Sequence, residues 1–271
     1  MESKEKVVII SDIHNRVDWI EEALRNIEHD KVIFLGDYFD DFHDTPKIAE
    51  KTANWLKHSL SFENRVHLIG NHDAAYTRSM NDFARCPGFD HLKNRVIHSI
   101  IDRNDWSKLK FATECHGWLL SHAGAHESIF SHPIHGASIE WILNYCDQGM
   151  QAFSSNIPHP SYQYSAARGM SRNFDIGGIT WLDWNHEFKP IENLNQIVGH
   201  TICTKFIEKK VEISDNAINI PVGKFEVVMD EPKNKCVRKI KSKNWNIDCN
   251  NKIIAFLIDG EFSWIPNKFL K

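Results

Sequence analysis

The chain has no long apolar segment, no paired-cysteine motif and no excess of positive charge. Its apolar runs stay far short of the roughly 20 residues that span a bilayer, which argues against a transmembrane helix. Its six cysteines are scattered, so they predict thiols in a reducing compartment rather than a disulfide framework. The formal net charge of −4 argues against a long nucleic-acid footprint. We therefore expect a cytoplasmic protein that binds neither membranes nor long nucleic acids.

The chain does contain enough apolar residues, 42% of 271, to build a substantial core. We see no repeat, low-complexity tract or clear linker, so we expect one domain over residues 1–271. Apolar runs at 7–10, 32–35 and 66–69 predict strands that are buried on both faces. Helical patterns separate them, at 18–29 with Asp18 as a plausible N-cap and again from Thr45 onward. Alternating strands and helices predict parallel pairing with right-handed crossovers.

The C-terminal half has a different pattern. Strand-like segments at 111–113 and 118–121 surround a turn, and others lie at 224–229, 237–240 and 253–258. Asp259-Gly260 predicts a hairpin turn after the last of these. A second sheet built from this half would complete an α/β sandwich. Residues 126–176 are instead rich in histidine and aromatic residues, and they predict either an insertion packed over the sheet or a segment that covers the substrate.

Five short segments carry side chains suited to binding metal ions. The first four follow apolar runs, which places them at strand ends, where open α/β sheets bind ligands. Their carboxylate, imidazole and amide groups are enough for two divalent cations. Two such ions about 3.5–4 Å apart promote in-line displacement at phosphorus. The segments are Asp12-Ile13-His14, Gly36-Asp37-Tyr38-Phe39-Asp40, Gly70-Asn71-His72-Asp73, Ser121-His122 and Gly199-His200-Thr201.

Their order resembles that of the calcineurin-like metallophosphoesterase superfamily, which runs D-x-H, G-D-x-x-D, G-N-H-D/E, a lone His and G-H. The ending Gly199-His200-Thr201 is nearest the branch of serine/threonine protein phosphatases and diadenosine tetraphosphatases. The resemblance implies two mixed sheets flanked by helices, an α-β-β-α sandwich. It also implies a dinuclear centre that activates water for attack on phosphorus. The implied metal ligands are Asp12, His14, Asp37 as the bridge, Asn71, His122 and His200.

The resemblance also implies two residues that handle protons. His72 is the candidate general acid for the leaving oxygen, and Asp40 is its partner, because a carboxylate beside an imidazole orients the ring. The alternative for Asp40 is a cap on the following turn. The mixed ligand set suits Mn²⁺, Fe or Zn²⁺, and we expect Mn²⁺.

The sequence departs from this branch at position 41, where Asp41 replaces the arginine that clamps phosphate. Arg168 and Arg172 are the candidate replacements, because a guanidinium can bind two phosphate oxygens at once. The alternative is that both are solvated loop residues, and Arg78 is a weaker candidate. A histidine without motif context, such as His67, is more often a hydrogen-bonded or surface residue than a metal ligand.

We expect a phosphomonoesterase that acts on a phosphoprotein or a small phosphate ester. One alternative on the same site is a hydrolase of diadenosine or other nucleoside polyphosphates. A phosphodiesterase or nuclease is less favoured, because the acidic chain predicts no basic groove. A non-catalytic scaffold is disfavoured, because all six implied ligands are present together with His72 and Asp40.

Overall fold

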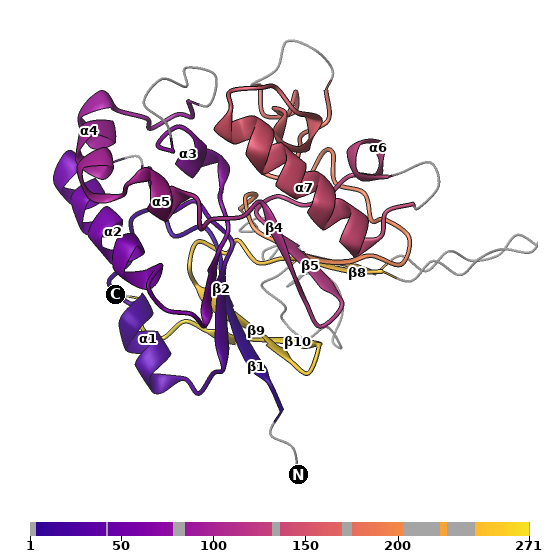
Figure 1. Ribbon diagram of the computed structural model, residues 1–271. Coiled ribbons are helices and arrows are strands. Elements are labelled where there is room, and N and C mark those ends of the chain that lie inside the picture. The colour runs from indigo at the N-terminus through magenta and orange to yellow at the C-terminus, as the bar shows by residue number, and fades with distance from the viewer. Residues whose placement is uncertain are drawn as a thin grey trace, which may run out of the picture.

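The computed structural model describes residues 4–41, 43–77, 85–131, 136–169, 175–202, 223–226 and 242–270, with the backbone alone at 223–226. In these residues the strands form two mixed sheets that pack face to face with helices on both outer sides (Figure 1). The architecture is the expected α-β-β-α sandwich.

The first sheet has the strand order β10-β9-β1-β2-β3. Strands β1, β2 and β3 run parallel, whereas β9 pairs antiparallel with both β1 and β10. The strand bounds are β1 Lys6–Ile10, β2 Lys31–Phe34, β3 Arg65–His67, β9 Ile253–Ile258 and β10 Glu261–Pro266.

The second sheet has the order β4-β5-β6-β8-β7. Strands β5, β6 and β8 run parallel, and the edge strands β4 and β7 run antiparallel to their neighbours. The strand bounds are β4 Ala112–Cys115, β5 Trp118–Ser121, β6 Asn195–Val198, β7 Gly223–Glu226 and β8 Lys243–Asn246.

Helices cover the outer faces of both sheets. Helices α1, α2 and α4 lie beside the first sheet, and α7 packs across β4 of the second (Figure 1). The helix bounds are α1 Ile20–Asn26, α2 Pro46–Ser59, α3 Asn71–Ala74, α4 His91–Ile100, α5 Arg103–Trp106, α6 Glu127–Phe130 and α7 Ile139–Ser154, with a 3-10 turn η2 at Pro160–Tyr162.

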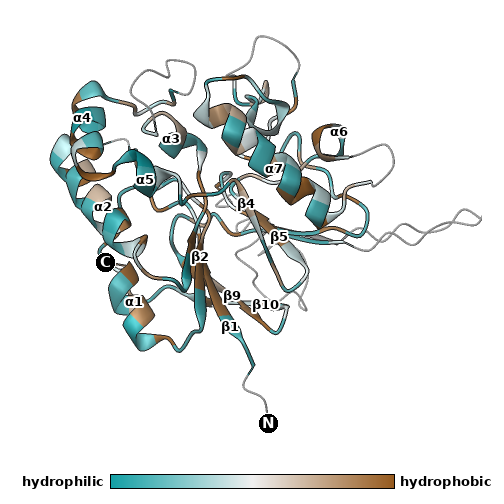
Figure 2. Ribbon diagram, viewed as in Figure 1, coloured by the Kyte–Doolittle hydropathy of each residue, from teal (hydrophilic) through white to brown (hydrophobic). Residues whose placement is uncertain are grey.

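The alternation of side chains along β1 explains why both of its faces are apolar. Val7 and Ile9 point into a cluster between the two sheets, together with Leu120 of β5. Val8 and Ile10 point the other way, into the cluster beneath the helices. Figure 2 accordingly shows predominantly hydrophobic strands in the first sheet, with mixed helices outside them.

Most of the predicted elements are present, with two differences. Asp18 does not cap α1, because the helix begins after Trp19 without a side-chain cap and Asp18 instead pairs with Lys51. The predicted third strand is shorter than expected, because Leu68 makes only an isolated bridge to Lys110. The predicted strand at 237–240 lies outside the described residues.

Other features of the described chain agree with the sequence. Thr45 caps α2 with Pro46 in its first turn, and Asp259 and Gly260 form the turn between β9 and β10. Cys86, Cys115, Cys146 and Cys249 are buried thiols. Among the described helices, none is long and apolar enough to cross a membrane.

Candidate active site

The five motif segments meet at one edge of the sandwich. The parallel strands β1, β2 and β3 deliver the first three segments at their carboxyl ends, and β5 and β6 deliver the other two. Five of the motif residues adopt positive φ angles between 43° and 69°, a region that non-glycine residues seldom enter. Such backbone strain persists where the surrounding structure fixes it, and it is concentrated at functional sites. The five are Asp12, His14, Asp37, Asp40 and His200.

The first ligand cluster consists of Asp12, His14 and Asp37. Nδ1 of His14 donates to the backbone carbonyls of Asp40, at 2.7 Å, and Phe39, at 3.1 Å. Those bonds leave Nε2 as the acceptor, and it lies 3.7 Å from Oδ2 of Asp37. Fixing one ring nitrogen so that the other can bind a metal is the usual arrangement of ligating histidines.

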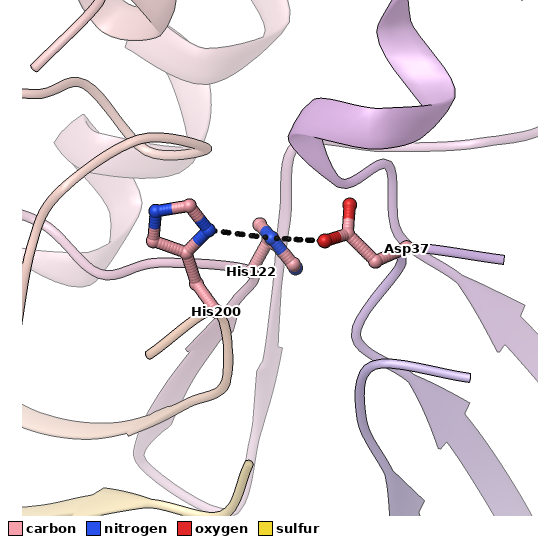
Figure 3. Close-up of side chains that lie close together, drawn as sticks. All are labelled: Asp37, His122 and His200. Carbon is pink, nitrogen blue, oxygen red and sulfur yellow. Dashed lines mark hydrogen bonds and ion pairs between the residues drawn. The ribbon is translucent and has the colours of Figure 1, made fainter. Parts of the chain in front are cut away.

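The second ligand cluster consists of Asp37, His122 and His200, drawn in Figure 3. Nδ1 of His122 donates to the carbonyl of Leu35 at 2.9 Å, which turns Nε2 toward the cluster. That Nε2 lies 3.3 Å from Oδ2 of Asp37, 3.2 Å from Nδ1 of His200 and 3.0 Å from Oδ1 of Asn71. All of the side chains named for this cluster are motif residues.

These distances fit a divalent cation. Ligands bound about 2.1 Å from an octahedral ion lie about 3 Å apart when they are adjacent, and the second cluster has that spacing. Nδ2 of Asn71 donates to the Cys86 sulfur, so Oδ1 is the atom that faces the cluster. Nε2 of His200 is buried without a hydrogen-bond partner in the described part of the chain. The convergence of Oδ2 of Asp37, Nε2 of His122, Nδ1 of His200 and Oδ1 of Asn71 indicates a position built for a positive charge.

The pKa shifts point the same way. Burial alone would lower the pKa of His122, but the facing Asp37 carboxylate outweighs it and raises that pKa to about 9. Burial would raise the pKa of Asp37, yet the imidazoles of His122 and His72 hold it well below its usual range. The pKa of Asp12 rises to about 8, first through burial and then through repulsion by Asp248. The metal-free chain therefore stabilises a positive charge next to Asp37.

Asp37 itself is fixed from several directions. Its Oδ1 accepts the backbone N–H of His72 at 2.9 Å, so Oδ2 is the oxygen that faces both clusters. The Asp73 carboxylate accepts the N–H groups of Asp37, Tyr38 and Gly70, each at 2.8 Å. A Cβ added to Gly70 would stand 2.4 Å from the Asp37 nitrogen, so only glycine fits there.

The predicted proton-handling pair lies beside the clusters. Nδ1 of His72 is 3.3 Å from Oδ2 of Asp40, and the rings of His72 and His14 meet edge to face at 5.2 Å. The Asp40 side chain is 1% exposed and that of His72 is 19% exposed, so the imidazole is the member open to solvent. The arrangement places a partly exposed imidazole, oriented by a buried carboxylate, beside both clusters.

The predicted phosphate clamps have other neighbours in the structure. Nε of Arg168 lies 2.8 Å from the Asp183 carboxylate, and one terminal nitrogen donates to the His200 carbonyl and the Thr201 hydroxyl. Its side chain remains 30% exposed. Arg168 therefore braces the loop that carries His200. Arg172 and Arg78 lie outside the described residues, so the clamp stays a prediction.

Several polar residues near the site had no assigned role in the sequence interpretation. Asp41 forms an ion pair with Arg16 at 3.5 Å, which compensates the negative charge of Asp41. Asp73, the last residue of the third motif segment, is buried against Asp37, and Lys93 and Asp248 are buried next to motif residues. For Asp248 the signal would have been its place closely after β8, the parallel neighbour of β6, but no strand was predicted at Lys243–Asn246. For Lys93 there was none, since its partners lie about 50 residues away in the sequence.

The fold and the converging ligands define a metal-binding α/β protein. Residues 5–216 match the family model described as calcineurin-like phosphoesterase, which covers more than half of the chain. The chain therefore belongs to the calcineurin-like phosphoesterase family, and family membership makes it a metal-dependent phosphoester hydrolase.

Solved structures similar to this chain include three proteins of low sequence identity. A metallophosphoesterase from Sphaerobacter thermophilus matches with 14% identity and a TM-score of 0.42, covering 96% of this chain and 87% of that one. A protein serine/threonine phosphatase from Saccharomyces cerevisiae matches with 14% identity and a TM-score of 0.41, covering 73% and 62%. A Thermus thermophilus protein matches with 9% identity and a TM-score of 0.39, covering 98% and 100%. No curated protein sequence matches this chain.

Proposed function

We propose that the protein is a phosphomonoesterase with a dinuclear metal centre, acting on a phosphoprotein or a small phosphate ester. The observation that supports this most directly is the pair of ligand clusters that share Asp37. One carboxylate oxygen, Oδ2, faces both clusters, as a bridging ligand would. Asn71 adds a neutral oxygen donor to the second cluster.

Bound divalent ions would supply Lewis acidity toward the phosphoryl oxygens and a water of lowered pKa. We expect Mn²⁺, because the first cluster is rich in carboxylates, whereas the imidazoles of the second also suit Zn²⁺ or Fe. Asp12 and His14 would hold one ion, His122, His200 and Asn71 the other, and Asp37 both.

The chain's own residues supply the remaining step. His72 lies beside the clusters with its ring partly exposed, so the ring can give a proton to the leaving oxygen of the ester. Asp40, buried behind it, orients the ring through Nδ1. Hydrolysis of a monoester releases an alcohol or a phenol. The departing oxygen needs a proton more as the pKa of that alcohol or phenol rises.

The test is a hydrolysis panel with Mn²⁺ supplied to metal-stripped protein. The substrates are p-nitrophenyl phosphate, bis-p-nitrophenyl phosphate, a phosphopeptide and diadenosine tetraphosphate, each also given to Asp37→Ala. We expect the highest kcat/KM on the monoester or the phosphopeptide, and none for the variant. A preference for the dinucleotide would favour the polyphosphate alternative, and a preference for the diester would favour a phosphodiesterase. No metal-dependent turnover of any phosphoester would overturn the proposal.

A further inference from the structure

Lys93 is a buried cation that the metal clusters do not account for. It lies on α4, is 2% exposed, and places Nζ 2.6 Å from Oδ1 of Asp40. The same Nζ lies 2.9 and 2.8 Å from the two oxygens of Asp44. Lysine is seldom fully buried unless it is paired, because its desolvation is costly. Both partners belong to the loop that follows β2, next to the candidate acid.

The two oxygens of Asp40 have separate partners. Oδ1 accepts from Lys93 and from the Tyr76 hydroxyl, each at 2.6 Å, whereas Oδ2 faces Nδ1 of His72. Two strong donors on Oδ1 fix the rotation of the carboxylate, and that rotation decides where Oδ2 points. The position of His72 thus depends on contacts that α4 makes from behind.

The same network reaches the first cluster. Asp44 accepts a hydrogen bond of 2.8 Å from Nδ2 of Asn15, the residue after His14. Lys93 therefore joins the loop after β1, the loop after β2 and helix α4. One ammonium against two carboxylates also leaves a single net negative charge beside His72, where the carboxylates alone would place two.

We propose that Lys93 is a positioning residue for the reaction. It acts through Asp40: it fixes the rotation of the carboxylate that orients His72 and reduces the negative charge beside that ring. The inference rests on the proposed function, because it assigns Lys93 to the proton-delivering part of that site. The role of Lys93 differs from that of Asp44, which holds Lys93 against the loop, and from that of the metal ligands.

The kinetic test uses Lys93→Met, which keeps the length of the side chain and removes its charge. With phenyl phosphate, whose phenolate is a poor leaving group, we expect kcat to fall about 10- to 100-fold, which lies within the range of general-acid catalysis. With p-nitrophenyl phosphate the loss should be smaller, and the bound metal should be unchanged. In an Asp40→Asn background, Lys93→Met should have no further effect, because residues that act as a unit are non-additive. The same loss in both backgrounds would overturn the proposal.

A second variant guards against a folding defect. Lys93→Met/Asp44→Asn removes one carboxylate together with the ammonium, so the buried charge stays balanced. If Lys93 acts through Asp40, the double variant still loses turnover on phenyl phosphate. If Lys93 only neutralises Asp44, the double variant recovers wild-type turnover, and the proposal is wrong. The matched control is Arg65→Met. Arg65, at the start of β3, is a buried cation that pairs with Glu21 of α1, away from the site.

A spectroscopic readout needs no substrate. Long-range ¹⁵N–¹H spectra of the histidine rings should show the His72 Nδ1–H bonded to Asp40 in the wild type and released in Lys93→Met. An unchanged His72 signal would contradict a positioning role. If the wild-type protein hydrolyses no phosphoester, the proposed function fails, and the ring spectrum still decides the role of Lys93.

Discussion

The two ligand clusters share Asp37 but differ in charge. The first combines Asp12 and Asp37 with one imidazole, and the buried Asp248 lies close enough to raise the pKa of Asp12. The second combines Asp37 with two imidazoles. When ionised, the two carboxylates give the first cluster the larger negative charge, and burial and their repulsion raise the pKa of Asp12 to about 8. In the second cluster the protonated His122 balances the shared carboxylate, whereas burial and the neighbouring His122 hold the pKa of His200 well below its usual range.

This difference shows that one shared residue can serve two environments. The pKa of Asp37 stays low because the imidazoles outweigh its burial, so it can face a cation on either side. The neutral amide of Asn71 limits the charge of the second cluster further. Hard divalent ions such as Mn²⁺ suit the first cluster, and borderline ions such as Zn²⁺ suit the second.

The largest effect should come from removing the shared ligand. Asp37→Ala takes one oxygen donor from both clusters, so we expect the metal content after equilibration with Mn²⁺ to fall from two ions per chain to none. Activity should fall with it to the background rate. Metal analysis after dialysis, beside a kinetic assay, measures both. Asp41→Ala is the control, because it removes a neighbouring carboxylate that pairs with Arg16 instead. An Asp37→Ala protein that keeps both ions would contradict the shared-ligand interpretation.

A smaller effect should follow when one cluster is broken at a time. Asp12→Asn should weaken the binding of the first ion only, and His200→Asn that of the second only. Each affinity should fall by more than about 100-fold, because losing a residue that only supports a ligand costs at most about that much. Calorimetric titration with Mn²⁺ and with Zn²⁺ should then show one remaining site. The Asp12 variant should favour Zn²⁺ and the His200 variant should favour Mn²⁺. The reverse preferences would show that the charge difference between the clusters does not set the metal.

A still more selective change leaves both clusters intact. His72→Ala removes no cluster ligand, so we expect both ions to stay bound while turnover falls about 10²- to 10⁴-fold with poor leaving groups. With good leaving groups the loss should be smaller, since they need less protonation. Rates over a series of substituted phenyl phosphates measure the dependence. A loss that is equal across the series would argue against His72 as the acid.

The positions of the ligands could be predicted from the sequence because they depend on local rules. Buried apolar runs such as Val7–Ile10 predict parallel strands, and the carboxyl ends of parallel strands meet at one edge. Any polar residue within two positions after such a run, as Asp12 is after Ile10, therefore lies near the others. The five motif segments are placed together for that reason.

The contacts that support the ligands could not be predicted, because they depend on packing between distant segments. Lys93 meets Asp40 across 53 residues, and a lysine two residues into α4 normally predicts a solvated side chain. Arg168 was predicted to be a phosphate clamp or a solvated loop residue; its additional contacts with the His200 carbonyl and the Thr201 hydroxyl could not be read from the sequence, and the clamp stays a prediction. The predicted cap at Asp18 is wrong, because α1 begins after Trp19 and a partner on α2, Lys51, binds the Asp18 carboxylate.

The smallest effect concerns a histidine outside both clusters, which shows what burial does without carboxylates. His67 is as buried as His122, but its ring nitrogens face the hydroxyls of Tyr38 and Ser59, each at 3.0 Å. Burial, followed by the charge of Arg65, lowers the pKa of His67 from 6.5 to about 3, whereas the carboxylates beside His122 raise its pKa.

A lowered histidine pKa stabilises the fold above the pKa of the unfolded chain. This stability is complete above pH 6.5 and should decline by about 1.4 kcal/mol per pH unit as the pH falls toward 3. His67→Gln keeps hydrogen-bonding capacity but cannot titrate, so its unfolding free energy should depend less on pH over this window. Urea denaturation of the metal-free proteins between pH 7 and 4 measures the difference, which cancels the titration of other groups. Parallel curves for the two proteins would show that His67 carries its proton in the folded state, and that burial alone does not separate it from the cluster histidines.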